Sequence, residues 1–156
     1  MRKASVVSLF VALVVVAFAV PAVASANPTT LRATLSGDGD PDGSGSALLQ
    51  IDKDKNTGVV CHQIHVENVT TPITGGAITV GESGEIVARL AITDPGQDLE
   101  GCTGQLGIRN RELNRITKDP SGYVLHLYNE EFPCDIFGPD LTCPPGAVRG
   151  QLQGVS

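Results

Sequence analysis

The fold is decided by residues 122–152, which read GYVLHLYNEEFP, then CDIFGPDLTC between two cysteines, and then PPGAVRGQL. Within residues 123–128, successive side chains would alternate between the two faces of a strand, and both faces have large residues. This pattern is typical of a strand inside a sheet. Residues 146–152 have the composition of a closing strand, in which Arg149 is the one charged residue. This stretch therefore predicts two β-strands joined by a segment that two cysteines enclose.

Upstream of this stretch, short strand patterns alternate with turns rich in Gly, Pro, Asn and Asp. The patterns predict strands over residues 31–35, 46–52, 59–69, 77–80 and 85–92, and loops over residues 37–46 and 94–101. Residues 110–117 predict the one helix, because Leu113 and Ile116 share a face and Pro120 follows its end. Short strands with Gly-rich turns predict an all-β protein, an antiparallel immunoglobulin-like or Greek-key β-sandwich with one short helix.

The N-terminal residues predict a signal peptide ahead of this domain. Arg2 and Lys3 precede an apolar run over residues 4–20, and Ala24-Ser25-Ala26 has the form of a cleavage site. The rival interpretation is an uncleaved membrane anchor, since the run has about the minimum length for a spanning helix. We expect cleavage after residue 26, secretion of residues 27–156 as a single domain, and no stable membrane insertion of that domain.

The charge balance of the chain is acidic, with 17 Asp and Glu against 11 Lys and Arg. Loss of Arg2 and Lys3 with the leader takes the formal net charge from −6 to −8. A field of this sign repels nucleic acid and anionic membranes. We therefore expect neither as a partner.

Disulfides are predicted by the four cysteines, Cys61, Cys102, Cys134 and Cys143, all of which lie after the leader. An even number in an exported chain favours disulfides, and three pairings are possible. Cys134 and Cys143 flank a short loop, which favours a local bridge and leaves Cys61 to pair with Cys102. A metal site is less favoured, because no His stands at zinc-ligand spacing from a Cys pair.

Several motifs, in this order, resemble the CHRD (chordin) domain of secreted bacterial proteins. They are LSG at 35–37, GDPDGSG at 39–45, Gly101-Cys102, DPSGY at 119–123 and GAVRGQL at 146–152. The strand cysteine of the family corresponds to Cys61, so the resemblance supports a Cys61–Cys102 bridge. It implies an extracellular, non-enzymatic binding or structural module that contacts a protein or a cell-surface component.

The chain departs from this family at three histidine positions. The family typically has A-H-I-H-x-G in its middle and Y-V-N-V-H-N before a late F-P. The corresponding positions here hold Ala77, Thr79 and Tyr128. If those imidazoles form a metal site in relatives, the resemblance implies that such a site is missing from this chain.

The histidines that are present lie at other strand positions. His62 and His65 are three residues apart on one predicted strand, so they point to opposite faces and cannot chelate one ion together. His126 faces the same way as Tyr128. We interpret all three as surface or hydrogen-bonded strand histidines.

Asp38, Asp40 and Asp42, followed by Gly43, copy the opening of an EF-hand calcium loop, because alternate carboxylates can converge on a hard cation. The pattern then fails, since position twelve is Leu49 rather than Glu. We keep weak calcium binding as an alternative function and predict no other cofactor. Asn68 begins a formal glycosylation sequon.

The segment between Cys134 and Cys143 presents Ile136, Phe137 and Leu141 among acidic residues. Apolar side chains on a stapled loop suit partner binding, because the bridge lowers the cost of ordering. The alternative is that Phe137 folds back onto the edge of the sheet. We predict this loop as the partner-binding site.

No motif for catalysis is present: the sequence lacks G-x-S-x-G, H-E-x-x-H and a phosphate-binding loop. A superoxide-dismutase-like metalloenzyme is a further alternative, against which the three replaced histidine positions count. We predict structural roles for Tyr123 and for Arg149, which should pair with a carboxylate or with carbonyls at the end of the sheet.

Overall fold

A computed structural model describes residues 28–53, 58–92, 96–104, 110–136, 138 and 142–155. The predicted leader lies outside this range. The strands are β1 Thr29–Gly37, β2 Ser44–Lys53, β3 Gly58–Glu67, β4 Ile73–Val80, β5 Glu85–Leu90, β6 Asp98–Gly104, β7 Tyr123–Asn129, β8 Val148–Gln151 and β9 Gln153–Gly154. The helices are α1 Asn110–Lys118 and two 3-10 turns, η1 Gly81–Ser83 and η2 Pro120–Gly122.

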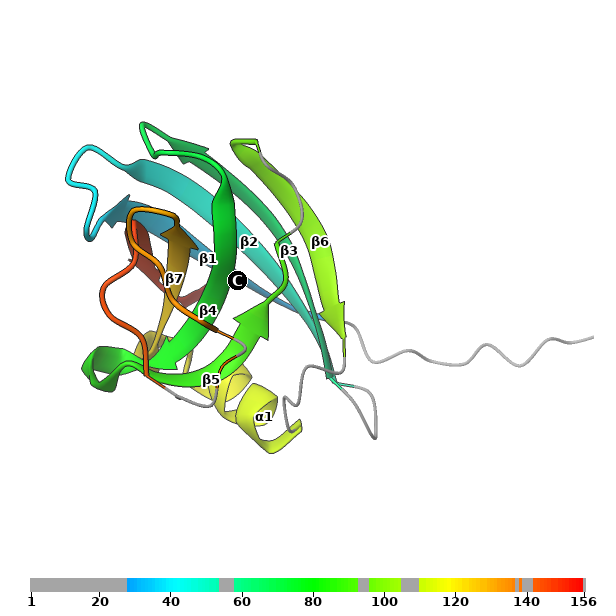
Figure 1. Cartoon of the computed structure of the whole chain (residues 1–156). Coiled ribbons are helices and arrows are strands. Elements are labelled where there is room, and N and C mark those ends of the chain that lie inside the picture. Colours follow the sequence, from blue (N-terminus) through cyan, green and yellow to red (C-terminus); the bar gives the residue numbers. More distant parts are fainter. Residues whose placement is uncertain are drawn as a thin grey trace, which may run out of the picture.

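The strands form one antiparallel sheet in the order β5-β4-β7-β8-β1-β2-β3-β6, with β9 paired to β1. The sheet curves so that β4, β5 and β7 lie opposite β1, β2, β3 and β6 (Figure 1). The Ala91 amide donates to Thr103 Oγ1 at 2.9 Å and joins the end of β5 to β6. The prediction of an antiparallel all-β fold with one short α-helix is thus confirmed for the described residues, whose strands form a nearly closed sheet.

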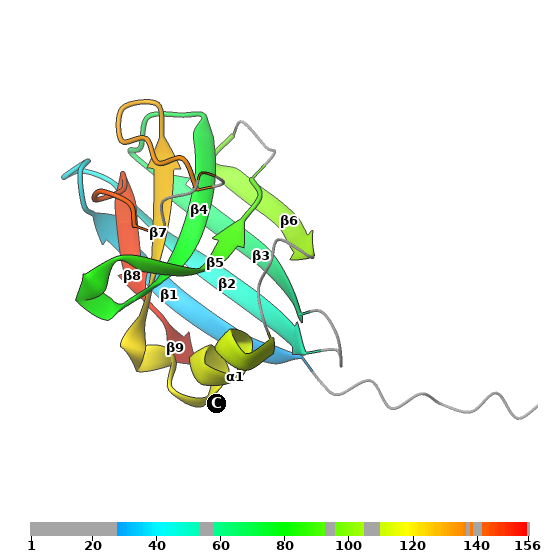
Figure 2. The same ribbon diagram turned by 60° about the horizontal axis from the view of Figure 1, so that its bottom comes forward.

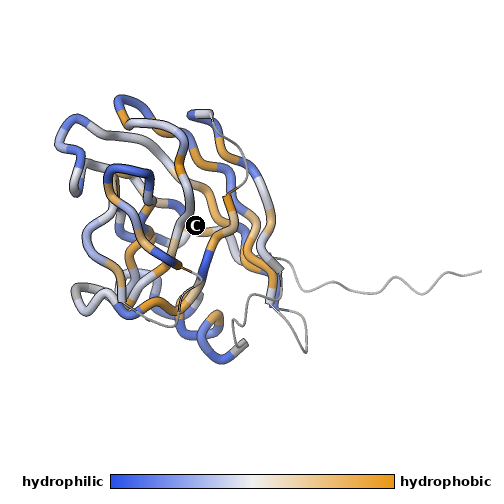
Figure 3. Tube along the Cα trace, in the orientation of Figure 1, coloured by the Kyte–Doolittle hydropathy of each residue, from blue (hydrophilic) through white to orange (hydrophobic). Residues whose placement is uncertain are grey.

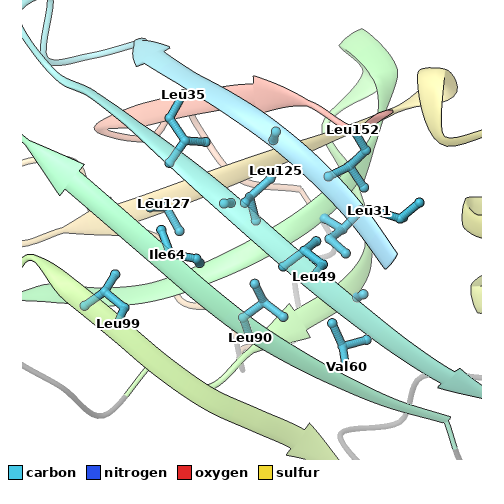
Figure 4. Packing of buried hydrophobic residues seen from close by; sticks show 14 of the residues in the cluster. Leu31, Leu35, Leu49, Val60, Ile64, Leu90, Leu99, Leu125, Leu127 and Leu152 are labelled. Atoms are coloured by element: carbon cyan, nitrogen blue, oxygen red, sulfur yellow. The ribbon is translucent and has the colours of Figure 1, made fainter. Parts of the chain in front are cut away.

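Alternation of side chains explains how the sheet encloses its core. In β1, Leu31, Ala33 and Leu35 are buried whereas Arg32 and Thr34 are exposed, and β2 and β3 follow the same period of two. The tube in Figure 3 shows this alternation as changing hydropathy along the strands. Large aliphatic side chains of both halves meet in the interior, as Figure 4 shows for Leu49, Leu125 and Leu127.

Helix α1 lies at one end of the curved sheet (Figure 2). Leu113 and Ile116 are fully buried in the core, as the predicted face requires. On the exposed side, Arg115 pairs with Glu112 at 3.2 Å. The Lys53 ammonium donates to Thr117 Oγ1 at 3.0 Å and ties the helix to the end of β2.

The predicted closing strand holds the two halves together, since β8 pairs with β7 on one side and with β1 on the other. A Cβ at Gly150 would lie 2.4 Å from the Thr34 carbonyl oxygen, so only glycine permits this close approach. The Leu152 amide donates to the Tyr123 carbonyl at 3.0 Å. Tyr123 thus contacts the closing segment through its backbone, and its half-buried ring packs against the core.

The sequence analysis was wrong about residues 98–101, which were expected within a loop. These residues open β6, which pairs with β3 from Val59↔Gly104 to His65↔Asp98. The strand is short, contains two glycines and carries acidic side chains on its outward face, so its composition is typical of a loop. Leu99 and Thr103 nevertheless point inward and are buried.

Candidate functional site

The outward sides of the two halves of the sheet differ. We call the outward side of β5, β4, β7 and β8 the covered face, and that of β1, β2, β3 and β6 the open face. One row across the covered face consists of Arg89, Ala77, His126 and Arg149, one residue from each strand. Between β7 and β8, the described residues 130–136, 138 and 142–147 form the covering segment, which packs against this face.

Ile136 is the centre of that packing. It is 3% exposed and forms a small cluster with Ala77, Ile86 and Tyr128, against which Cys134 and Cys143 also pack. The Arg89 side chain donates from Nε to the Ile136 carbonyl. The prediction that Ile136 is presented to a partner is therefore corrected: Ile136 packs against the sheet, because β4 offers an apolar surface. Phe137 and Leu141 lie outside the described residues.

Small residues in β4 create the space that Ile136 fills. A Cβ at Gly75 would lie 2.7 Å from Ile136 Cδ1, and Ala77 is the next residue on the same side of the strand. The run Gly75-Gly76-Ala77 was therefore a signal in the sequence for close approach of another segment. The sequence analysis did not use it.

Both predicted disulfides are present in the structure, Cys61–Cys102 and Cys134–Cys143. The second bridge closes the covering segment on itself. Asn129 fixes the start of this segment, since its buried Oδ1 accepts from the Glu131 amide at 3.1 Å and the Phe132 amide at 2.8 Å. Its Nδ2 donates to the Thr70 carbonyl at 2.9 Å.

Asp38 fixes the end of the covering segment. Its Oδ2 accepts from the Gly146 amide at 3.0 Å and lies 3.4 Å from His126 Nδ1, while its Oδ1 lies 3.5 Å from Arg149 Nε. The Asp38 side chain is 9% exposed. Arg149 therefore has the kind of carboxylate partner that the sequence analysis expected. Its effect on stability stays a prediction.

This placement bears on the predicted calcium loop. Asp38 is directed toward its three protein partners, Asp40 is half-buried and Asp42 is exposed. Asp40 donates its amide to the Ala147 carbonyl at 3.1 Å, so the loop is attached to the covering segment. Across the described residues, no group of three or more His, Cys, Asp and Glu side chains could hold a metal ion. Calcium binding by Asp38, Asp40 and Asp42 stays a prediction.

Burial controls the chemistry of His126 and Tyr128, whose rings stack with centroids 6.3 Å apart. Burial lowers the pKa of His126 below its ordinary 6.5, and Arg149 also lowers it, whereas Asp38 opposes the shift. Burial, with a smaller effect of Asp38, raises the pKa of Tyr128 to about 12. Among the described residues, His126 Nδ1 and Thr79 Oγ1 are buried without a well-formed hydrogen bond. His126 is thus a buried histidine rather than the surface residue we considered.

The three positions singled out by the CHRD resemblance all lie on this covered face. Ala77 and Thr79 are alternate residues of β4, and Tyr128 is in the adjacent strand β7, where it faces Gly75. All three are at most 1% exposed. The structure therefore brings the three positions together on one face, and two of them, Ala77 and Tyr128, pack with Ile136.

The open face has regular cross-strand rows of side chains, which are polar except for Leu48. One row runs Thr34, Ser46, His65, Asp98, and the next runs Arg32, Leu48, Gln63, Glu100. His65 Nδ1 lies 2.6 Å from Asp98 Oδ1, and Nε2 lies 3.3 Å from Glu67 Oε1. These hydrogen bonds raise the pKa of His65, and the bond with Asp98 has the largest effect. His62 is buried and His65 exposed, as their spacing predicted.

Two adjoining hollows lie on the open face. One of about 440 Å³ is lined by both rows, and one of about 430 Å³ extends it toward Gln50 and the Cys61–Cys102 bridge. They share Leu48, Gln63 and Glu100. Together they form a groove with a half-buried leucine at its floor and amide, carboxylate and hydroxyl groups along its sides. The sequence analysis did not predict a site here.

Comparison with known proteins adds no relative: no family model, no curated protein and no solved structure matches this chain. In the described part of the chain, no helix is long and apolar enough to cross a membrane.

Proposed function

We propose that this protein is an exported, non-enzymatic binding module and that the groove on the open face is its partner-binding site. The observation that carries this proposal is the pair of adjoining hollows, which share Leu48, Gln63 and Glu100. An apolar floor with polar groups along its sides suits recognition, because apolar contact supplies affinity and the polar groups supply specificity. The partner is an extracellular protein or cell-surface component.

The open face replaces the loop of Ile136, Phe137 and Leu141 as the proposed site. Ile136 is used inside the molecule, where its burial stabilises the covered face. The groove, in contrast, is built on four paired strands, so a partner would meet groups that are already ordered. The binding function is retained from the sequence analysis, and only its location changes.

Export by a leader over residues 1–26 is part of the proposal. Two disulfides are compatible with an extracellular protein. Mass spectrometry of the protein recovered from the medium should give a mature N-terminus at Asn27. Recovery of the intact leader in the membrane fraction would favour the anchor instead.

The CHRD family and the Greek-key sandwich also remain our proposals. The Cys61–Cys102 bridge and the shared face of Ala77, Thr79 and Tyr128 support the family assignment. The hydrogen bond from Ala91 to Thr103 supports a Greek-key arrangement, since it would place β6 beside β5. The calcium and superoxide-dismutase-like alternatives are less favoured, because Asp38 has internal partners and Ala77 and Thr79 stand at two histidine positions of the CHRD pattern.

The binding proposal is tested with an amide-to-arginine change inside the groove and a matched change outside it. Gln63→Arg adds a long charged side chain where both hollows meet, and Asn114→Arg adds the same side chain on the exposed side of α1. Each protein is immobilised and incubated with secreted and cell-surface proteins of the producing cells. Quantitative mass spectrometry should identify a component that Gln63→Arg loses by about tenfold, or about 1.4 kcal/mol, and Asn114→Arg retains.

Two results would count against this proposal. Equal capture by Gln63→Arg and the wild type would remove the groove as the site. Capture of nothing above the level of a denatured control would argue against a binding module.

A further inference from the structure

The Cys61–Cys102 bridge lies on the open face, outside the core. The two residues are direct cross-strand partners in β3 and β6, and they line the second hollow. Cys102 is exposed and Cys61 is half-buried. The Cys134–Cys143 bridge differs, since both of its cysteines are half-buried and pack against the cluster of Ile136 and Tyr128.

The position of Cys102 leaves one sulfur open to approach. Strand β6 is the last strand of the sheet path, so among the described strands Cys102 has a paired neighbour on one side only. Cys61 instead lies between Gln50 of β2 and Cys102. An incoming thiolate can therefore reach Cys102 more readily than Cys61.

We infer that the Cys61–Cys102 bridge is a site of thiol–disulfide exchange with a cysteine-containing peptide segment held in the second hollow. The peptide thiolate attacks Cys102 Sγ and forms a new S–S bond, while the bond between Cys102 and Cys61 breaks. Cys61 leaves as a thiolate and takes a proton from water. The peptide sulfur is oxidised and the Cys61 sulfur is reduced, so no further reactant is needed.

The lining of the hollow indicates what kind of peptide it takes. Leu48 offers an apolar contact, and Gln50 and Gln63 offer amides that can bond to a peptide backbone. Among the described residues, Glu100 is the one carboxylate that lines this hollow. A basic residue beside the peptide cysteine is therefore favoured over an acidic one, and the preference should weaken with salt.

The exchange is tested with two probe peptides, acetyl-Gly-Cys-Lys-amide and acetyl-Gly-Cys-Glu-amide, added to the folded, oxidised protein. Mass spectrometry after acid quenching should find the adduct on Cys102 while Cys134–Cys143 remains closed, at a rate that increases with peptide concentration. After correction for the reactivity of each peptide toward a small disulfide, the basic peptide should react about threefold faster at low salt. Glu100→Gln should remove this preference.

The matched control is Glu67→Gln, a carboxylate change on the same face but outside both hollows, which should leave the preference unchanged. Three results would overturn the inference. The first is a rate that does not depend on peptide concentration while both bridges open together, because exchange then requires unfolding of the protein. The others are an adduct that forms first at Cys134 or Cys143, and a Glu100→Gln variant that keeps the preference for the basic peptide. The inference is independent of the partner-capture experiment, which uses no thiol probe and can fail by itself.

Discussion

The covered and open faces belong to one sheet, yet they treat similar side chains in opposite ways. On the covered face, His126 and Tyr128 are buried beneath the covering segment, and on the open face His65 is exposed beside Asp98. Each face also has one disulfide, half-buried on the first and partly exposed on the second. The comparison teaches that the covering segment, and not the sheet, decides which outward residues are available to a partner.

The largest expected difference between the faces concerns apolar packing. Ile136→Ala should lower the free energy of unfolding by about 3 kcal/mol, because it empties a buried site that Ala77 and Tyr128 cannot fill. Leu48→Ala on the open face should cost about 1 kcal/mol or less, since Leu48 is only half-buried. Urea unfolding of both variants measures the difference. Equal losses would mean that the covering segment does not pack as tightly as described.

A smaller effect is expected at the polar anchor of the covering segment. Asp38→Asn should cost about 1–2 kcal/mol, because it removes the charge that faces His126 and Arg149. Arg149→Ala should cost about 0.5–1 kcal/mol, since its side chain is 56% exposed and solvent screens the pair.

Asp42→Asn is the control for the Asp38 variant, because Asp42 is an exposed carboxylate in the same loop. It should change the free energy of unfolding by less than about 0.5 kcal/mol. Thermal melts give the order of the three variants. An Asp42 variant as unstable as the Asp38 variant would contradict the anchor. Thermal melts with millimolar calcium test the alternative that the Asp loop binds calcium. That alternative requires calcium to raise the melting temperature of the wild type, and this rise should be absent from Asp38→Asn, Asp40→Asn and Asp42→Asn.

The smallest effects concern pH, where the two faces should respond with opposite signs. The pKa of His126 is lowered on folding, so the unfolded chain binds this proton more readily and stability falls as pH drops below about 6.5. The pKa of His65 is raised, so its contribution is present below about 6.5 and is lost as pH rises through the higher folded value.

NMR titration of the two imidazoles measures this directly, with His126 expected to titrate below 6.5 and His65 above it. His126→Gln should flatten the acid side of the stability profile, and His65→Gln should leave that side nearly unchanged. The reverse order of the two pKa values would contradict the assignment of covered and open faces.

Most strands could be predicted from the sequence because their side chains alternate between apolar and polar. Both disulfides could be predicted because the spacing of the four cysteines limits the pairings. It could not decide between a presented and a folded-back Ile136, since an apolar residue between two cysteines has the same pattern in either state. The deciding information was 60 residues upstream, in the small residues Gly75 and Ala77. The sequence likewise does not show that Asp38, one of three alternate aspartates that suggest a cation site, faces His126 and Arg149.

The groove was beyond sequence reasoning for a related reason. Its lining residues come from four strands that are distant in the sequence, so no single stretch of the chain contains a motif for it. Gln63 and Glu100 become neighbours only through the register of β3 and β6. The strand β6 that supplies Glu100 was itself expected to begin as a loop.

The anchoring of the covering segment has a consequence for protein engineering. Asn129 holds its start and Asp38 holds its end, and both residues belong to the sheet side of the junction. When the ends of a chain segment are fixed in this way, doubling the length between them costs only about 0.6 kcal/mol of closure entropy. The exposed Pro144 and Pro145, which follow the Cys134–Cys143 bridge, are therefore a natural insertion point for a foreign epitope, which the sheet would display without being redesigned.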